Sequence, residues 1–132
     1  MTKVFWRRGI AGAAMALVAG VGSAGAGQDG DPDAGAEIYA AQCKGCHTVS
    51  IAPTLRGVAD RPVASVADFG GYSPALKAKA GETWTAANLE AFLAAPTTFA
   101  PGTRMVTVVA DPQARADVIA YIRALPPPRQ DR

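Results

Sequence analysis

Cys43-Lys44-Gly45-Cys46-His47 is the stretch of this 132-residue chain that decides how the rest must fold. A Cys-x-x-Cys-His sequence is the attachment signature of c-type haem, in which both thiols form thioethers with the haem vinyl groups and the histidine ligates the iron. On a helix, two sulfurs three positions apart lie on one face, and the next residue can turn its imidazole toward the metal. The motif therefore predicts one covalent haem c attached to Cys43 and Cys46, with its iron bound by His47.

Two other kinds of site also use a Cys-x-x-Cys pair, namely a thioredoxin-like dithiol and half of a zinc site. Cys43 and Cys46 are the only cysteines and His47 is the only histidine. A zinc ion bound by nitrogen and sulfur would thus have at most three ligands, whereas structural zinc has four. A thioredoxin-like motif requires a βαβ setting, and the chain has little strand pattern. Haem attachment is the interpretation that remains.

The first 26 residues have the pattern of an export signal. Basic residues at positions 3, 7 and 8 precede an uncharged apolar run, and the small residues 24–26 fit a cleavage site. A membrane anchor is the alternative, but the apolar run of about 13 residues is shorter than the roughly 20 that span a bilayer. We therefore expect residues 1–26 to be a cleaved signal peptide, residues 27–132 to form a single domain, and the protein to be periplasmic.

The net charge depends on this signal. The whole chain has 13 basic and 11 acidic residues, for a charge of +2. Three basic residues lie in the signal, which leaves 10 basic against 11 acidic and a charge of −1. No run of lysine and arginine suggests nucleic-acid binding, so we expect no nucleic acid among the partners.

Pairs of a capping residue and a proline mark the starts of three predicted helices, at Asp31-Pro32, Ser73-Pro74 and Asp111-Pro112. Residues 105–109 alone have a strand-like composition. The sequence therefore predicts an all-α fold of about four helices with long loops. The helices are expected from Pro32 to the haem motif, from Pro74 to Ala80, from Ala86 to Ala95 after the cap Thr85, and from Pro112 to about Leu125.

An electron-carrying iron with both axial positions filled needs a second ligand opposite His47. Once the signal is removed, Met105 is the only methionine, and it follows a Pro/Gly-rich loop that we judge unsuited to burying a core side chain. The alternative is a methionine that fills a gap in the core. A His/Met pair raises the reduction potential relative to harder axial ligands. The sequence thus predicts Met105 as the sixth ligand.

The chain resembles the class I cytochromes c, and specifically the small soluble bacterial c2 type, which is similar to mitochondrial cytochrome c. The resemblance extends from about Asp33 to Leu125. It implies the cytochrome c fold, with helices and loops wrapped around one haem and with the first and last helices crossing at a small residue, here Gly35. The marks of the resemblance are residues 43–47, residues 52–57, Arg61, Tyr72-Ser73, Trp84 and residues 101–105.

The resemblance also implies roles for four further residues. The carbonyl of Pro53 would accept a hydrogen bond from Nδ1 of His47, which orients the imidazole. Arg61, Tyr72 and Trp84 would donate hydrogen bonds to the haem propionates, because buried carboxylates need donors. The alternatives are ordinary surface charge for Arg61 and partly buried aromatic side chains for Tyr72 and Trp84.

Three features depart from the pattern of the family. The loop between His47 and Pro53 is shorter than in the mitochondrial type, so that side of the haem is expected to be less covered. Phe92 stands where the family has a tyrosine that reaches the methionine sulfur, and Leu76 stands where it has an asparagine. Both changes remove a polar group near the iron.

The function implied is that of a monohaem carrier of single electrons between redox proteins, and not an enzyme. The alternatives are a peroxidase-like haem enzyme, a redox subunit dedicated to one dehydrogenase, and a thiol–disulfide oxidoreductase. Expected partners are a donor and an acceptor, such as a cytochrome bc1-type complex, an oxidase or a reductase. We expect a monomer that associates with membranes only through these partners. The basic residues that could face a partner are Lys44, Arg56, Lys77, Lys79 and Arg104.

Overall fold

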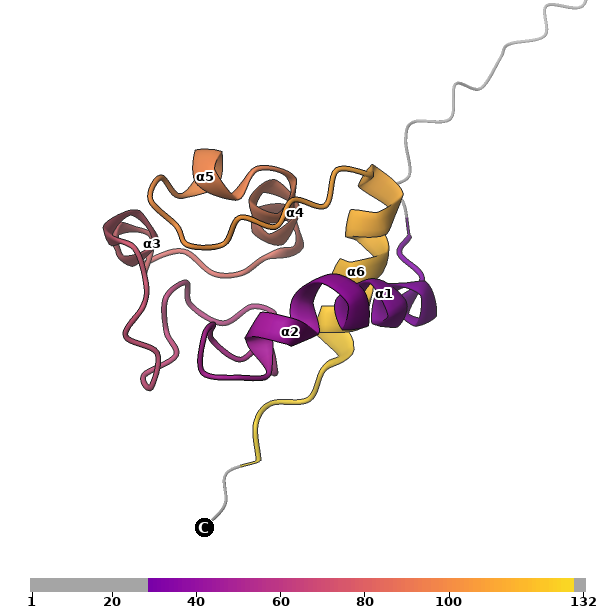
Figure 1. The fold of residues 1–132 in the computed structure, drawn as a ribbon, viewed down its shortest axis with the longest axis horizontal. Coiled ribbons are helices and arrows are strands. Elements are labelled where there is room, and N and C mark those ends of the chain that lie inside the picture. Colours follow the sequence, from indigo (N-terminus) through magenta and orange to yellow (C-terminus); the bar gives the residue numbers. More distant parts are fainter. Residues whose placement is uncertain (1–28, 130–132) are drawn as a thin grey trace, which may run out of the picture.

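Helices form the regular secondary structure of this computed structural model, which describes residues 29–129 (Figure 1). Within that range there is no β-strand, only one isolated antiparallel bridge between Pro62 and Thr83. The all-α prediction is therefore confirmed, and residues 105–109 form no strand. The elements in chain order are α1 (Pro32–Ile38), the π-helical segment η1 (Tyr39–Cys43), α2 (Lys44–His47), α3 (Pro74–Ala78), α4 (Ala86–Ala94), α5 (Pro96–Phe99) and α6 (Pro112–Ala124).

The four predicted helix starts are correct, because each capping side chain accepts a backbone hydrogen bond of its helix. Asp31 accepts from Asp33 N–H, Ser73 from Leu76 N–H and Thr85 from Asn88 N–H. At α6, Asp111 Oδ2 accepts from Ala114 N–H at 2.7 Å. Each cap satisfies a donor that the helix itself leaves without a partner.

The helix count and some helix ends differ from the prediction. The first helix continues into the haem motif, but η1 interrupts its α-helical pattern, with the N–H of Lys44 bonded to Tyr39 O five residues back. Pro96 directly follows the helix predicted from Ala86 to Ala95. It also occupies the first turn of the unpredicted α5, where a proline needs no N–H partner. α3 ends at Ala78, short of the predicted Ala80, and α4 and α6 each end one residue early.

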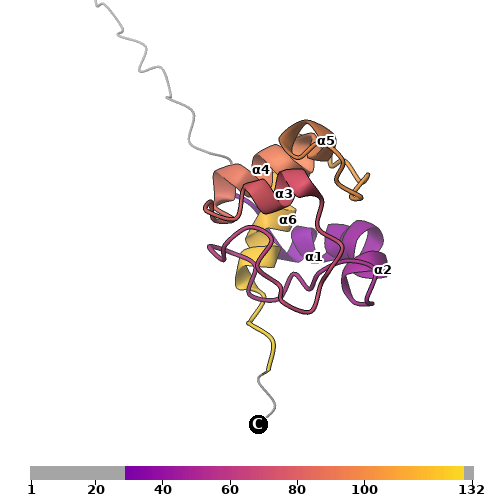
Figure 2. The same ribbon diagram turned by 90° about the vertical axis from the view of Figure 1, so that its left-hand side faces the viewer.

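The first and last helices cross at Gly35, as the family resemblance implies (Figures 1 and 2). A Cβ atom on Gly35 would lie 2.0 Å from the carbonyl oxygen of Asp117 in α6, so only glycine permits this approach. One turn later, the rings of Tyr39 and Tyr121 contact each other with centroids 5.1 Å apart. Val118 is fully buried in the α6 face. This crossing fixes the first helix, whose continuation η1 ends at the buried Cys43 of the haem motif.

The described helices bear on the predicted signal peptide and on a membrane span to different degrees. The predicted signal peptide, residues 1–26, lies outside the described residues. Within residues 29–129, no helix has the length and apolar character that a membrane span requires.

Candidate haem site

The two cysteines of the motif lie in different environments. Cys43 ends η1 with its side chain in the core, whereas Cys46 on α2 is exposed. Burial raises the pKa of the Cys43 thiol above its ordinary value of 9.0. Both are free thiols. Among the described residues, no three His, Cys, Asp or Glu side chains are grouped so that they could hold a metal ion, so the zinc interpretation has no ligand set there.

His47 ends α2 and is oriented by the loop that follows it. Its Nδ1 lies 2.6 Å from the carbonyl oxygen of Pro53, as the family resemblance implies. A carbonyl oxygen can only accept, so Nδ1 carries the proton and Nε2 keeps its lone pair. Burial lowers the pKa of the imidazole below its ordinary value of 6.5, while the hydrogen bond to Pro53 opposes this shift. Burial thus favours the neutral imidazole, which is the form that binds a metal.

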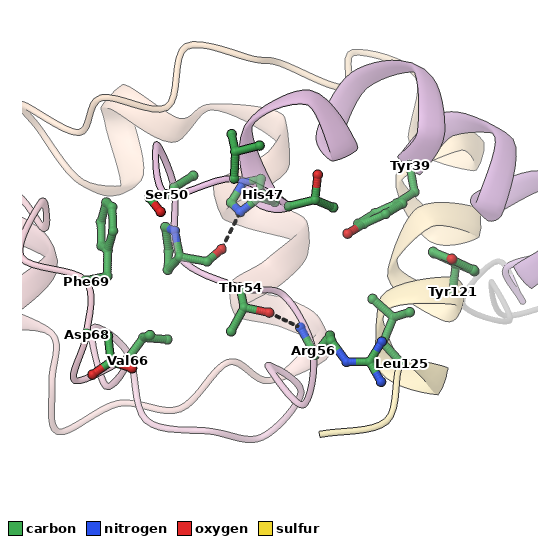
Figure 3. A pocket seen from close by; sticks show the side chains of 14 residues that line it. Tyr39, His47, Ser50, Thr54, Arg56, Val66, Asp68, Phe69, Tyr121 and Leu125 are labelled. Atoms are coloured by element: carbon green, nitrogen blue, oxygen red, sulfur yellow. Dashed lines mark hydrogen bonds between the residues drawn. The ribbon is translucent and has the colours of Figure 1, made fainter. Parts of the chain in front are cut away.

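A cavity of about 610 Å³ adjoins this hydrogen bond (Figure 3). His47 and Pro53 line it together with Tyr39, whose hydroxyl points into the space. Thr48, Val49, Ser50 and Ala52 form part of its wall, and the neighbouring Ile51 is 70% exposed. That the short loop leaves this side of the haem less covered stays a prediction.

The other predicted site residues do not line this cavity. Arg61 and Trp84 lie next to each other, because Trp84 N–H donates to Arg61 O at 2.9 Å. The Arg61 guanidinium donates to Thr54 O and Arg56 O, both at 3.2 Å. Its Nε–H is buried and has no hydrogen-bond partner within residues 29–129. A buried donor without an acceptor is costly, so this group fits a propionate supplied from outside the chain.

Tyr72 is partly buried and its hydroxyl is already oriented. Its oxygen accepts a hydrogen bond from Val66 N–H at 3.2 Å, and its ring contacts the edge of Phe69. A hydroxyl that accepts one hydrogen bond can still donate its own proton. Leu76, in the position of the family asparagine, is buried in the core.

Met105 is partly buried against the hydrophobic core. It is not one of the buried core residues, and its role as the sixth ligand stays a prediction. Trp84, Phe92 and Phe99 form an aromatic cluster in the same core, with ring centroids 5.2 to 5.8 Å apart. The thioether is thus a soft donor in apolar surroundings, and Phe92 offers it no hydroxyl.

Taken together, these groups fit a haem c. The described residues supply two free thiols, an imidazole whose Nδ1 is hydrogen-bonded to Pro53 O, a partly buried thioether and a buried guanidinium N–H without an acceptor. Sequence reasoning did not identify Arg115, which hydrogen-bonds to the end of the segment that carries Met105. No motif signals it, since an arginine on a helix is ordinarily a solvated charge.

Comparisons with known proteins agree with this site. The sequence model of the cytochrome c family matches residues 32–126. Cytochrome c2 of Rhodomicrobium vannielii is 40% identical over 116 residues, which cover 83% of this chain and 90% of that protein. Cytochrome c-type cyt cy of Rhodobacter capsulatus is 41% identical over 103 residues, which cover 74% of this chain but only half of that protein.

A solved structure shows the same fold. Ferricytochrome c2 from Rhodopseudomonas palustris aligns with a TM-score of 0.64 and 32% identity, over 72% of this chain and 98% of its own. Cytochromes c hold one haem c covalently, and they are electron carriers and not enzymes. The family model that matches residues 32–126 and the cytochrome c2 relative show that this chain belongs to the cytochrome c family.

Proposed function

We propose that this protein is a periplasmic monohaem carrier that moves single electrons between redox proteins, with its iron ligated by His47 and Met105. The observation that carries the proposal is the 2.6 Å hydrogen bond between His47 Nδ1 and Pro53 O. It leaves Nε2 with a lone pair for a metal and fixes the plane of the ring. A carrier benefits from such a fixed ligand, because little has to move when the charge on the metal changes.

The remaining site residues each have a task in this proposal. Haem c, when bound, supplies an iron that accepts and returns one electron. Cys43 and Cys46 tie it to the chain, and the soft sulfur of Met105 favours the reduced metal. Arg61, Tyr72 and Trp84 hold the propionates, which is supported by the buried Arg61 Nε–H and by the spare proton of the Tyr72 hydroxyl.

The location and partners follow from the sequence and remain part of the proposal. Residues 1–26 direct export and are cleaved, and residues 27–132 act as one monomeric domain in the periplasm. The donor and the acceptor are redox proteins, such as a cytochrome bc1-type complex, an oxidase or a reductase. The intact mass of the purified protein tests the processing: it should equal residues 27–132 plus one haem, even after denaturation. A mass that includes Met1 would contradict cleavage.

Replacing Met105 tests the ligation. Met105→Leu keeps a side chain of similar volume but has no sulfur, so it separates ligation from packing. In the oxidised protein, any band from sulfur-to-iron charge transfer should vanish, the reduction potential should fall, and added cyanide should bind rapidly. Val108→Ala changes a half-exposed residue of the same segment and should leave all three properties as they are.

The contrary result is also clear. If the unchanged protein already binds cyanide or carbon monoxide rapidly, and Met105→Leu alters neither the spectrum nor the potential, then Met105 is not the sixth ligand. A peroxidase-like haem protein would then be the better description, because such chemistry requires an open iron position.

A further inference from the structure

The segment that carries Met105, residues 100–110, is held mainly at its two ends. It runs from α5 past α4 to the start of α6 (Figure 1). At its beginning, Thr103 N–H donates to the fully buried Ala100. At its end, Val109 is buried and its N–H donates to Leu93 O in α4 at 3.0 Å.

The middle of this segment has few contacts of its own. Within residues 29–129, the only hydrogen bond from residues 104–108 joins Met105 N–H to Thr103 Oγ1 at 3.4 Å. Val106 and Val108 are 80% and 50% exposed. Gly102 has a φ of +78°, where glycine turns freely. The position of the methionine sulfur therefore depends on how firmly the Val109 end is fixed.

Arg115 in α6 fixes that end. Its Nη1 donates to the carbonyl oxygens of Val109 and Ala110 at 2.7 and 2.8 Å. Its Nε donates to Glu90 Oε1 in α4 at 2.6 Å, which makes an ion pair. The Arg115 side chain is only 11% exposed. Because a guanidinium is planar and its donors are rigidly spaced, these three bonds hold α4, α6 and the end of the segment in one arrangement.

We propose that Arg115, held in place by Glu90, is a positioning residue that keeps Met105 on the iron. This inference rests on the proposed ligation by Met105. For the sulfur to leave the metal, the segment must swing away. It can pivot at Gly102, but its far end cannot follow while two carbonyls remain bonded to Arg115. Without the guanidinium, the state in which the segment has moved away becomes more populated.

The size of the effect follows from the two bonds to a charged donor. Losing a charge-assisted hydrogen bond changes an equilibrium by about tenfold. Losing two should therefore raise the population of the open state by about 100-fold, or by about 10-fold where water replaces one of them. An external ligand binds the iron only when the sulfur is off. Its apparent affinity therefore rises by the same factor as that population.

The experiment measures imidazole binding to the oxidised holoprotein. Arg115→Met should raise the apparent affinity by about 10- to 100-fold, while the helical circular dichroism stays unchanged. Glu90→Gln should have a smaller effect in the same direction, because its amide oxygen can still accept from Nε. Arg115→Lys, which keeps the charge but lacks the planar fork, should fall between Arg115→Met and the unchanged protein. Arg115→Lys provides the test of the positioning role if Arg115→Met does not fold.

Two control variants separate positioning from general weakening. Val118→Ala opens the fully buried face of α6 and lowers overall stability while leaving the hydrogen bonds of Arg115 in place. Arg123→Met removes the same charge from another ion pair of α6, with Asp60 at 3.7 Å. Both should leave the imidazole affinity within about twofold of that of the unchanged protein. For Arg123→Met the reason is that a surface ion pair contributes little, and for Val118→Ala it is that Arg115 keeps its hydrogen bonds to the segment.

The outcomes also distinguish this inference from the proposed ligation. If Arg115→Met raises the affinity no more than Val118→Ala does at equal loss of stability, the positioning role is overturned while the ligation by Met105 stands. If the unchanged protein binds imidazole as tightly as Met105→Leu does, the ligation itself fails and the positioning role fails with it.

Discussion

Gly35→Ala should weaken the crossing of the first and last helices more than a single methyl group ordinarily does. The added Cβ would lie 2.0 Å from Asp117 O, 2.6 Å from Asp117 C and 2.9 Å from the Cβ of Tyr121. An ordinary contact begins at 3.4 Å, so α1 and α6 would have to separate by roughly 1.4 Å. The two nearest atoms belong to the backbone of Asp117 and the third is a Cβ, so none of them can rotate away. We expect a loss at the upper end of the range for overpacking, about 3 kcal/mol.

The assay is denaturation of the holoprotein by guanidinium chloride, followed by far-ultraviolet circular dichroism. The loss of about 3 kcal/mol should appear as a lower midpoint of unfolding with an unchanged slope. Gly45→Ala is the matched control, because a Cβ on Gly45 in α2 would have no neighbour within 4 Å. That change should be neutral or slightly stabilising, since alanine favours a helix. If Gly35→Ala costs less than about 1 kcal/mol, the helices are not in the close contact described.

Three further results are expected. Burial and the neighbouring Tyr121 raise the pKa of Tyr39 above its ordinary value of 10.0; the stability this group contributes is therefore present below pH 10 and is lost as the pH rises above it. In urea titrations above pH 10, Tyr39→Phe should lose stability less steeply than the unchanged protein, and equal slopes would contradict the shift. Asp111→Ala should cost about 1 kcal/mol by removing the α6 cap, whereas Asp111→Asn should cost little; equal losses would mean that the cap contributes through its charge alone. Electron transfer to an acidic partner should slow with added salt, because the Debye length shrinks to about 8 Å at physiological ionic strength; a rate that salt leaves unchanged would assign docking to apolar contacts.

Much of this architecture could be predicted because its determinants are local in sequence. A capping side chain and the donor that it satisfies are two or three residues apart, so Asp31, Ser73, Thr85 and Asp111 identify their helices without tertiary information. The Cys-x-x-Cys-His motif is likewise contained in five residues. The hydrogen bond from His47 to Pro53 spans six residues and was accessible only through the family resemblance.

The features that escaped prediction depend on contacts between distant parts of the chain. Arg115 and Glu90 are 25 residues apart, and nothing in either local sequence indicates that they meet. Helix α5 was missed because the residue before Pro96 is Ala95, which has no side chain that could cap a helix and so gives no start signal. The partial burial of Met105 against the core arises from tertiary packing, which overrides the loop-like composition of its neighbours.

The α-helical turn between Gly35 and the π-helical segment η1 limits how far this protein tolerates gain or loss of residues. In an α-helix each residue turns the chain by about 100° and advances it by about 1.5 Å, whereas a π-helical turn already holds one residue more than an α-helical turn. Deleting one residue from the α-helical turn between Gly35 and Tyr39 would therefore rotate everything downstream relative to Gly35, which α6 holds in place. Cys43 would turn out of the core, and the imidazole that follows it would face another direction. Homologous chains should thus keep the spacing between positions 35 and 39 fixed, whereas the loop of residues 48–52 can change in length as long as the carbonyl of Pro53 still reaches Nδ1 of His47.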